Sequence, residues 1–95
     1  MNEGHEQRVW AALKEEAPAD AVYRLAVAMR DEGVSQADLY AVFSRVCRQL
    51  DSGDPRFDAM ADTLDYIIGF CSTPMKLFAH YLGRDEREEI EKTEE

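Results

Sequence analysis

The spacing of the apolar residues is the feature that most limits how this chain can fold. The clearest run, with steps of three and four residues, consists of Leu39, Val42, Phe43, Val46 and Leu50. Such spacing gathers apolar side chains on one face of an α-helix, and that face must be buried. The apolar run 66–71 would also suit a strand, but it continues the helical phase of the residues before it and has no partner strand elsewhere. The sequence therefore predicts an all-α fold.

Proline and glycine mark the ends of the first predicted helices. A first helix is expected over residues 3–16. Pro18 suits the first turn of a second helix, which should end near Asp31. Gly33 can adopt the left-handed conformation that closes a helix, so the second helix and the next one should be separated by a tight turn.

Small polar residues mark the starts of the later helices. Ser35 is a good N-cap for the third helix. Asp54 and Pro55 suit the N-cap and first position of a fourth helix. A fifth helix is expected over residues 75–82, closed by Gly83.

Chain length limits the number of domains. Ninety-five residues can bury one small core but not two, so we expect one helical domain, residues 1–83, built as a compact bundle of four to five short helices. The hairpin of the third and fourth helices should form its core, with Phe43 and Leu64 fully buried. Residues 84–95 carry seven acidic and three basic residues, and their only large apolar side chain is Ile90. This segment is predicted to be an acidic, flexible tail or a solvated extension of the fifth helix.

Charge limits the classes of partner. The formal net charge is -9. A nucleic-acid backbone or an anionic membrane surface would repel such a chain, so neither is expected as a partner. The sequence has no apolar run long enough for a transmembrane helix and no signal peptide near its start, so we expect a cytoplasmic protein.

The two cysteines are predicted to be reduced. If the third and fourth helices form a hairpin that turns near Gly53, Cys47 lies roughly 18 Å from Cys71, at about 1.5 Å per helical residue. That separation is far beyond disulfide reach. Both cysteines are therefore interpreted as small apolar residues of the core in a reducing compartment.

A stripe of carboxylates is the most suggestive polar feature. On the fourth helix it comprises Asp54, Asp58, Asp62 and Asp65, which fall within roughly 80° of one another at 100° per residue. Three interpretations stay open: a solvated face, pairing with Arg24, Arg45 or Arg48 of other helices, or recognition of a basic protein or a divalent cation. Tyr66, at the edge of its helix, could extend a binding surface because tyrosine is common at protein interfaces.

No residue pattern in the sequence predicts catalysis. His5 and His80 stand outside any metal-binding spacing, and no serine or cysteine has a predicted base beside it. We therefore expect no enzyme activity, no cofactor and no metal site.

The string 62–72, following a Gly-Val-Ser-Gln helix start, resembles small bacterial all-helical proteins of uncharacterised function. The likeness covers about residues 22–78. It implies a bacterial origin and a helical fold, and it carries no activity.

Three functional hypotheses follow. The first is a non-enzymatic module whose acidic surface docks onto or neutralises a basic protein, as immunity proteins, inhibitors and adaptors do. The second is a self-associating structural protein, since so short a chain cannot cover all its apolar residues. The third, which the sequence favours least, is a metal-dependent hydrolase using Asp58, Asp62 and Asp65.

Overall fold

A computed structural model of the chain describes residues 2–69, 77–78 and 81–93. The described residues form helices and no strand, which confirms the all-α prediction. The helices are α1 (Asn2–Leu13), α2 (Pro18–Asp31), α3 (Gln36–Arg48), α4 (Pro55–Ile68) and α5 (Arg84–Thr93).

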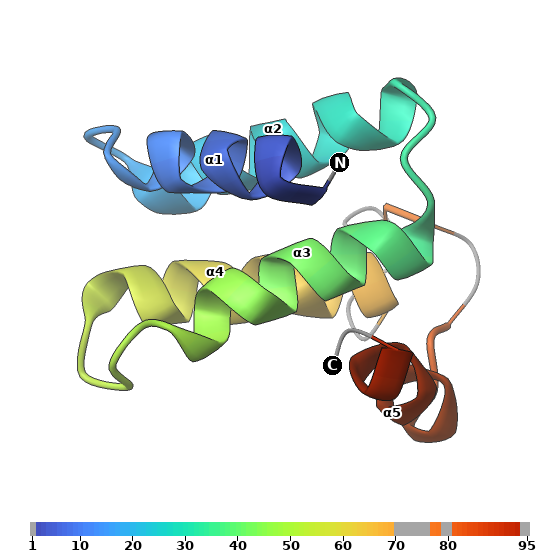
Figure 1. The fold of residues 1–95 in the computed structure, drawn as a ribbon. Helices are drawn as coiled ribbons and strands as arrows, with labels where there is room; N and C mark the ends of the chain where they lie inside the picture. Colours follow the sequence, from blue (N-terminus) through green and yellow to red (C-terminus); the bar gives the residue numbers. More distant parts are fainter. Residues whose placement is uncertain (1, 70–76, 79–80, 94–95) are drawn as a thin grey trace.

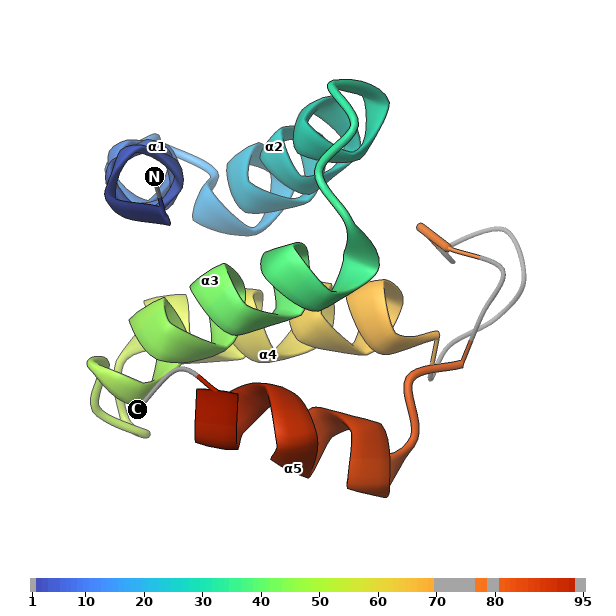
Figure 2. The same ribbon diagram turned by 45° about the vertical axis from the view of Figure 1, so that its right-hand side comes forward.

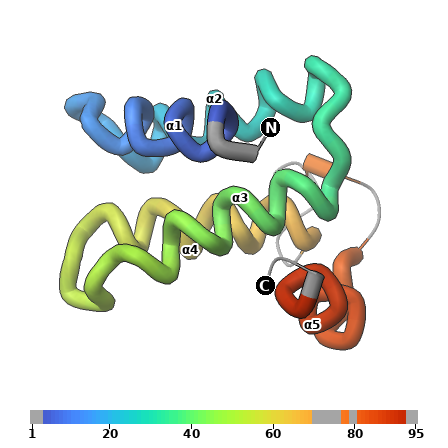
Figure 3. The backbone as a smooth tube through the Cα atoms, in the orientation of Figure 1, coloured from blue at the N-terminus to red at the C-terminus, as the bar shows by residue number. Residues whose placement is uncertain are grey.

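Two antiparallel helix pairs make up most of the fold. The pair α1 and α2 forms one layer and the pair α3 and α4 the other, with α1 over α3 and α2 over α4 (Figures 1 and 3). The fifth helix, α5, lies against α3 on the side away from the first layer (Figure 2). The Cα radius of gyration is 12.3 Å, close to the value of about 12 Å for a compact chain of this length. The predicted compact bundle is confirmed.

The junction between α2 and α3 follows the predicted chemistry. Gly33 has a φ of 99°. The amides of Gly33 and Val34 donate to the carbonyls of Arg30 and Met29, both at 3.0 Å. This is the Schellman arrangement, which satisfies the last carbonyls of a helix. Ser35 then caps α3, because its hydroxyl accepts from the Asp38 amide at 3.1 Å.

Two other predicted helix boundaries are wrong. The first helix ends at Leu13 rather than at residue 16, and the amides of Lys14 and Glu15 turn back onto carbonyls three residues earlier. Pro18 opens α2 and disfavours a helical conformation at Ala17, so α1 cannot continue into α2 without a break. Of the helix predicted over 75–82, the described residues 77–78 and 81–82 are not helical, and the remainder lies outside the described residues.

The buried face of α4 is rotated from the predicted one. Phe43 of α3 is fully buried, as expected, but the prediction that Leu64 is fully buried is wrong. Met60 and Ile67, which the apolar pattern also places on this face, are fully buried, and Thr63 joins them at its centre. The Thr63 hydroxyl donates to the Ala59 carbonyl at 3.0 Å, so this polar side chain is buried without an unpaired donor. Leu64 therefore lies at the margin of the core, where it is partly buried.

The acidic C-terminal segment forms a helix over most of its length. The flexible tail is not confirmed, because Arg84–Thr93 is helical and packs against α3. Ile90 packs against the core, and Arg48 donates to Glu91 at 2.9 Å. Tyr40 of α3 lies within reach of the charges of Glu91 and Arg87 on α5, and it is only 8% exposed.

The state of the cysteines and the length of the helices bear on the compartment in which the chain could reside. Cys47 is buried as a free thiol, as predicted, whereas Cys71 lies outside the described residues. Among the described helices, none has the length and apolar character needed to cross a membrane.

Candidate functional site

The four carboxylates of the predicted stripe do line one side of α4, but their surroundings differ. Asp58 and Asp62 are exposed, whereas Asp54 and Asp65 are partly buried. The rotation of the buried face toward Thr63 moves the core away from the stripe, so the exposed pair keeps its contact with solvent.

Asp54 serves the start of α4. Its carboxylate accepts from the Arg56 amide at 2.9 Å, as an N-cap does. The Arg56 guanidinium also binds it, with an N–O distance of 2.8 Å. Hydrogen bonds from the Arg56 side chain and backbone lower the pKa of Asp54. This carboxylate is therefore already compensated, and its role is structural.

Asp58 and Asp62 have no such compensation. Within the part of the chain that the structure describes, neither makes an ion pair or a hydrogen bond through its side chain. One helical turn separates them, a spacing at which two like charges repel by a few tenths of a kcal/mol. Of the four carboxylates of the stripe, Asp58 and Asp62 are thus the exposed pair without a compensating charge, and their repulsion destabilises α4 slightly.

The arginines that were candidates for neutralising the stripe are bound elsewhere. Arg24 pairs with Asp20 of its own helix at 3.0 Å. Arg48 pairs with Glu91 of α5 at 2.9 Å. Arg45 binds Glu6 of α1 at 3.2 Å, and hydrogen bonds from Gln49 and Arg45 lower the pKa of Glu6. The Arg45 and Arg48 pairs join α3 to α1 and α5, and none of the three pairs neutralises the exposed face of α4.

Asp65 lies where α4 approaches α5. Burial raises the pKa of Asp65, the charge of Asp62 raises it further, and Arg87 of α5 opposes both effects. The Nε of Arg87 is buried and has no hydrogen-bond partner among the described residues. Arg87 therefore acts on Asp65 through its charge rather than through a hydrogen bond.

Tyr66 is a packing residue more than a surface one. Its ring meets the ring of Tyr23 on α2 edge to face, with 5.4 Å between the centroids. Its backbone carbonyl accepts from the Leu77 amide at 3.2 Å. Aromatic pairs of this geometry are worth about 0.5–1.5 kcal/mol beyond the area that they bury. Tyr66 thus ties α4 to α2.

Metal binding at these carboxylates would need at least three ligands close together. No three His, Cys, Asp or Glu side chains among the described residues lie close enough together to hold a metal ion. Asp62 and Asp65 approach each other on α4, but two carboxylates on one helix give too few ligands for Mg²⁺ or Ca²⁺.

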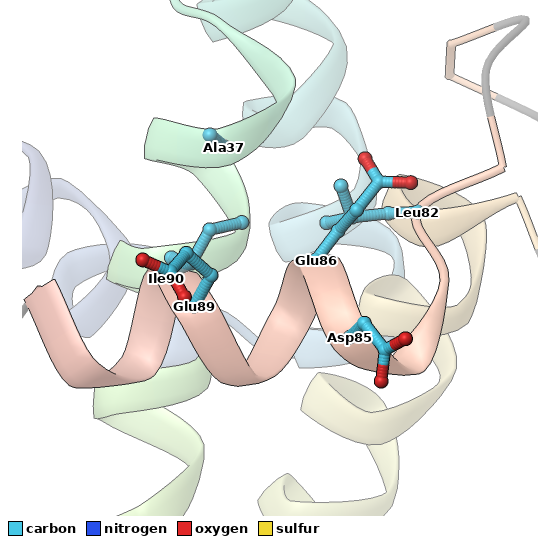
Figure 4. Close-up of a pocket in the computed structure, with 6 residues that line it drawn as sticks. All are labelled: Ala37, Leu82, Asp85, Glu86, Glu89 and Ile90. Carbon is cyan, nitrogen blue, oxygen red and sulfur yellow. The ribbon is translucent and has the colours of Figure 1, made fainter.

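Sequence reasoning missed a surface depression of about 460 Å³ between α5 and the first turn of α3. Apolar residues from three segments line it, namely Ala37, Leu82 and Ile90, and three carboxylates of α5 border it, namely Asp85, Glu86 and Glu89 (Figure 4). The four-residue step from Glu86 to Ile90 places these two side chains next to each other if the segment is helical. The sequence could have indicated the depression only if this segment had been predicted to be a packed helix.

Comparisons of the chain with protein-family models, with curated proteins and with solved structures find no match.

Proposed function

We propose that this protein is a non-enzymatic binding module whose acidic surface docks onto or neutralises a basic protein, in the manner of an immunity protein, inhibitor or adaptor. Asp58 and Asp62 on α4 form the centre of that surface. The proposal includes no cofactor, and it places the protein in the cytoplasm.

One observation carries the proposal. Asp58 and Asp62 repel each other on one turn of α4, and the arginines nearest in the sequence are bound elsewhere. A basic partner would remove this repulsion and gain a charge-assisted contact with each carboxylate. The repulsion between Asp58 and Asp62 in the free protein thus favours the binding of a cation-rich surface.

The charge of the whole chain supports the same partner chemistry. A net charge of -9 on a domain of this size produces a field that attracts basic proteins over a distance of about one Debye length, ~10 Å at 0.1 M salt. Such steering raises the rate of association more than the lifetime of the complex. We therefore expect binding that weakens steeply with salt.

Self-association is the alternative. The described surface gives it little apolar area, because Tyr81, 47% exposed, is the only large hydrophobic side chain that is exposed among the described residues. Stable interfaces between copies usually need a larger apolar patch. Sedimentation at high micromolar concentration separates the two hypotheses, because the binding module should remain monomeric.

Capture from a lysate of the source cells tests the proposal. The immobilised protein should retain a basic protein at about 50 mM salt and release it at about 500 mM. The variant Asp58→Asn/Asp62→Asn should lose that partner. The matched control Glu15→Gln/Glu16→Gln removes the same charge from an exposed turn and should keep it. Equal retention by the wild type and by the α4 variant would refute the role of this surface.

A further inference from the structure

Helix α5 contributes less to the core than the other described helices do. None of residues 84–92 is buried, whereas each of the helices α1 to α4 has buried side chains. Ile90 is the only large apolar residue of α5, and it packs against the core while it stays partly exposed. Little apolar area therefore holds α5 on α3, and a helix of ten residues is only marginally stable by itself.

The chain is fixed immediately before α5. The side chain of Leu82 is buried, and its amide donates to the Ile68 carbonyl at the end of α4, at 2.8 Å. Gly83 follows and is the last residue before the helix. Glycine has the widest choice of backbone conformations, and the nearest side-chain atoms are 3.9 Å from where a Cβ would lie. A rotation at Gly83 would thus move α5 as a unit and leave Leu82 in place.

Buried polar groups lie on the side of α3 that α5 covers (Figure 2). Tyr40 and Ser44 are buried and lie one helical turn apart on that side. Arg48, one turn further along, donates to Ser44 at 3.3 Å and to Glu91 of α5 at 2.9 Å. Burial raises the pKa of the Tyr40 phenol, and the charges of Glu91 and Arg87 both act on it. Helix α5 thus shields a row of polar side chains on α3 from solvent.

The closed position of α5 leaves one polar group unsatisfied. The buried Nε of Arg87 has no hydrogen-bond partner among the residues that the structure describes. A buried donor without a partner costs free energy, and solvent would satisfy this donor if α5 moved away from α3. This cost opposes the contribution of Ile90 and of the Arg48–Glu91 pair to closure.

From these observations we infer that α5 is a strap, which swings about Gly83 and uncovers the Tyr40 side of α3 while the core of α1 to α4 stays folded. Ile90 and the Arg48–Glu91 pair hold the strap closed. Its opening controls the access of solvent and reagents to this side of α3. The inference does not depend on the proposed function, because it involves neither Asp58 nor Asp62.

Hydrogen exchange of the ¹⁵N-labelled full chain tests the hinge. The amides of residues 88–92 should exchange through one common opening, at least about ten-fold faster than the slowest amides of α3 and α4. The amide of Leu82 should keep the protection of α4, because it lies before the hinge. Exchange of residues 88–92 only at the rate of the slowest core amides, or rates that rise steadily toward Lys92 as in fraying, would overturn the inference.

Two variants and a matched control test what closes the strap. Ile90→Ala should speed the exchange of residues 88–92 about ten-fold, because the apolar contact is lost. Glu91→Gln should speed it about two- to five-fold, and this effect should shrink at about 1 M salt. Glu88→Gln removes the same charge from a pair with Arg84 within α5, so it should change the rate by less than about two-fold. Equal effects of Glu91→Gln and Glu88→Gln would contradict the role of the Arg48–Glu91 pair.

The thiol of Cys47 reports whether the side of α3 is uncovered. Cys47 is buried and lies three residues after Ser44 and seven after Tyr40, which places all three on one side of the helix. In a Cys71→Ser background, Ile90→Ala should raise the rate of Cys47 labelling by the same factor as the exchange of residues 88–92. The protection of the α3 and α4 amides shows that the core of the variant is intact. A labelling rate that Ile90→Ala leaves unchanged would overturn the inference.

Discussion

The rotation of α4 predicts a large difference between two neighbouring truncations, Ile67→Ala and Leu64→Ala. Ile67 is 0% exposed, so the alanine leaves a cavity in the core between α2, α3 and α4. Truncation of a fully buried isoleucine costs about 2–5 kcal/mol. Leu64 lies at the margin of the core, where solvent already reaches part of its side chain and a cavity can be filled by water or by small shifts. Its truncation should cost only about 1–2 kcal/mol.

These costs are large against the stability of the protein. A domain of this size is stable by roughly 5–10 kcal/mol. A loss of about 1 kcal/mol lowers Tm by about 4–8 °C in a domain of this length. Ile67→Ala should therefore melt about 8–40 °C below the wild type and Leu64→Ala about 4–16 °C below it.

Urea and thermal melts followed by circular dichroism measure both variants. Asp62→Asn is the control on the opposite side of α4. It should change stability by less than about 0.5 kcal/mol, because this exposed carboxylate makes no ion pair with the described residues. If Leu64→Ala proved as costly as Ile67→Ala, the assigned face of α4 would be wrong, and the position of Asp58 and Asp62 would fall with it.

Three further predictions concern α4, α5 and the free thiol. Because the pKa of Asp65 is raised from its ordinary value of 3.8, its ionised form disfavours folding. Asp65→Asn should therefore raise Tm at pH 7. In thermal melts at a series of lower pH values, this gain in Tm should shrink as the pH falls through the raised pKa. The Arg48–Glu91 pair, 51% and 41% exposed, should show a coupling of about 0.2–1 kcal/mol in a double-mutant cycle, and no coupling would mean that this ion pair does not stabilise the contact between α5 and α3. Burial raises the pKa of Cys47. In a Cys71→Ser background, its thiol should therefore react with a disulfide reagent far more slowly in the folded protein than in guanidinium. Equal rates would contradict its burial.

Local chemistry made the helix junctions predictable from the sequence. Gly33, Ser35 and Asp54 each satisfy backbone groups within a few residues of themselves, so no knowledge of the tertiary structure was needed. The spacing of Asp58 and Asp62 likewise places them on one side of a helix, but whether that side is exposed depends on how α4 packs.

Features that depend on packing were not predictable in this way. Thr63 can be buried because its hydroxyl bonds within its own helix, and the apolar pattern alone placed the buried face of α4 nearer Leu64. The acidic segment was predicted to be flexible or solvated from its composition, yet one isoleucine and one ion pair accompany its packing on α3. The depression at Ala37 exists only because of that packing, so no analysis of the sequence by segments could have revealed it.

The central claim is that the acidic face of α4 binds a basic protein. Amide chemical shifts of the ¹⁵N-labelled protein, recorded while the protein retained from the lysate is added, test this claim most directly. The account predicts that the largest changes fall on Asp58, Asp62 and their neighbours in α4, and that residues 4–16 do not change. Changes confined to α1 and α2, or the same changes in the Asp58→Asn/Asp62→Asn variant at unchanged affinity, would contradict it.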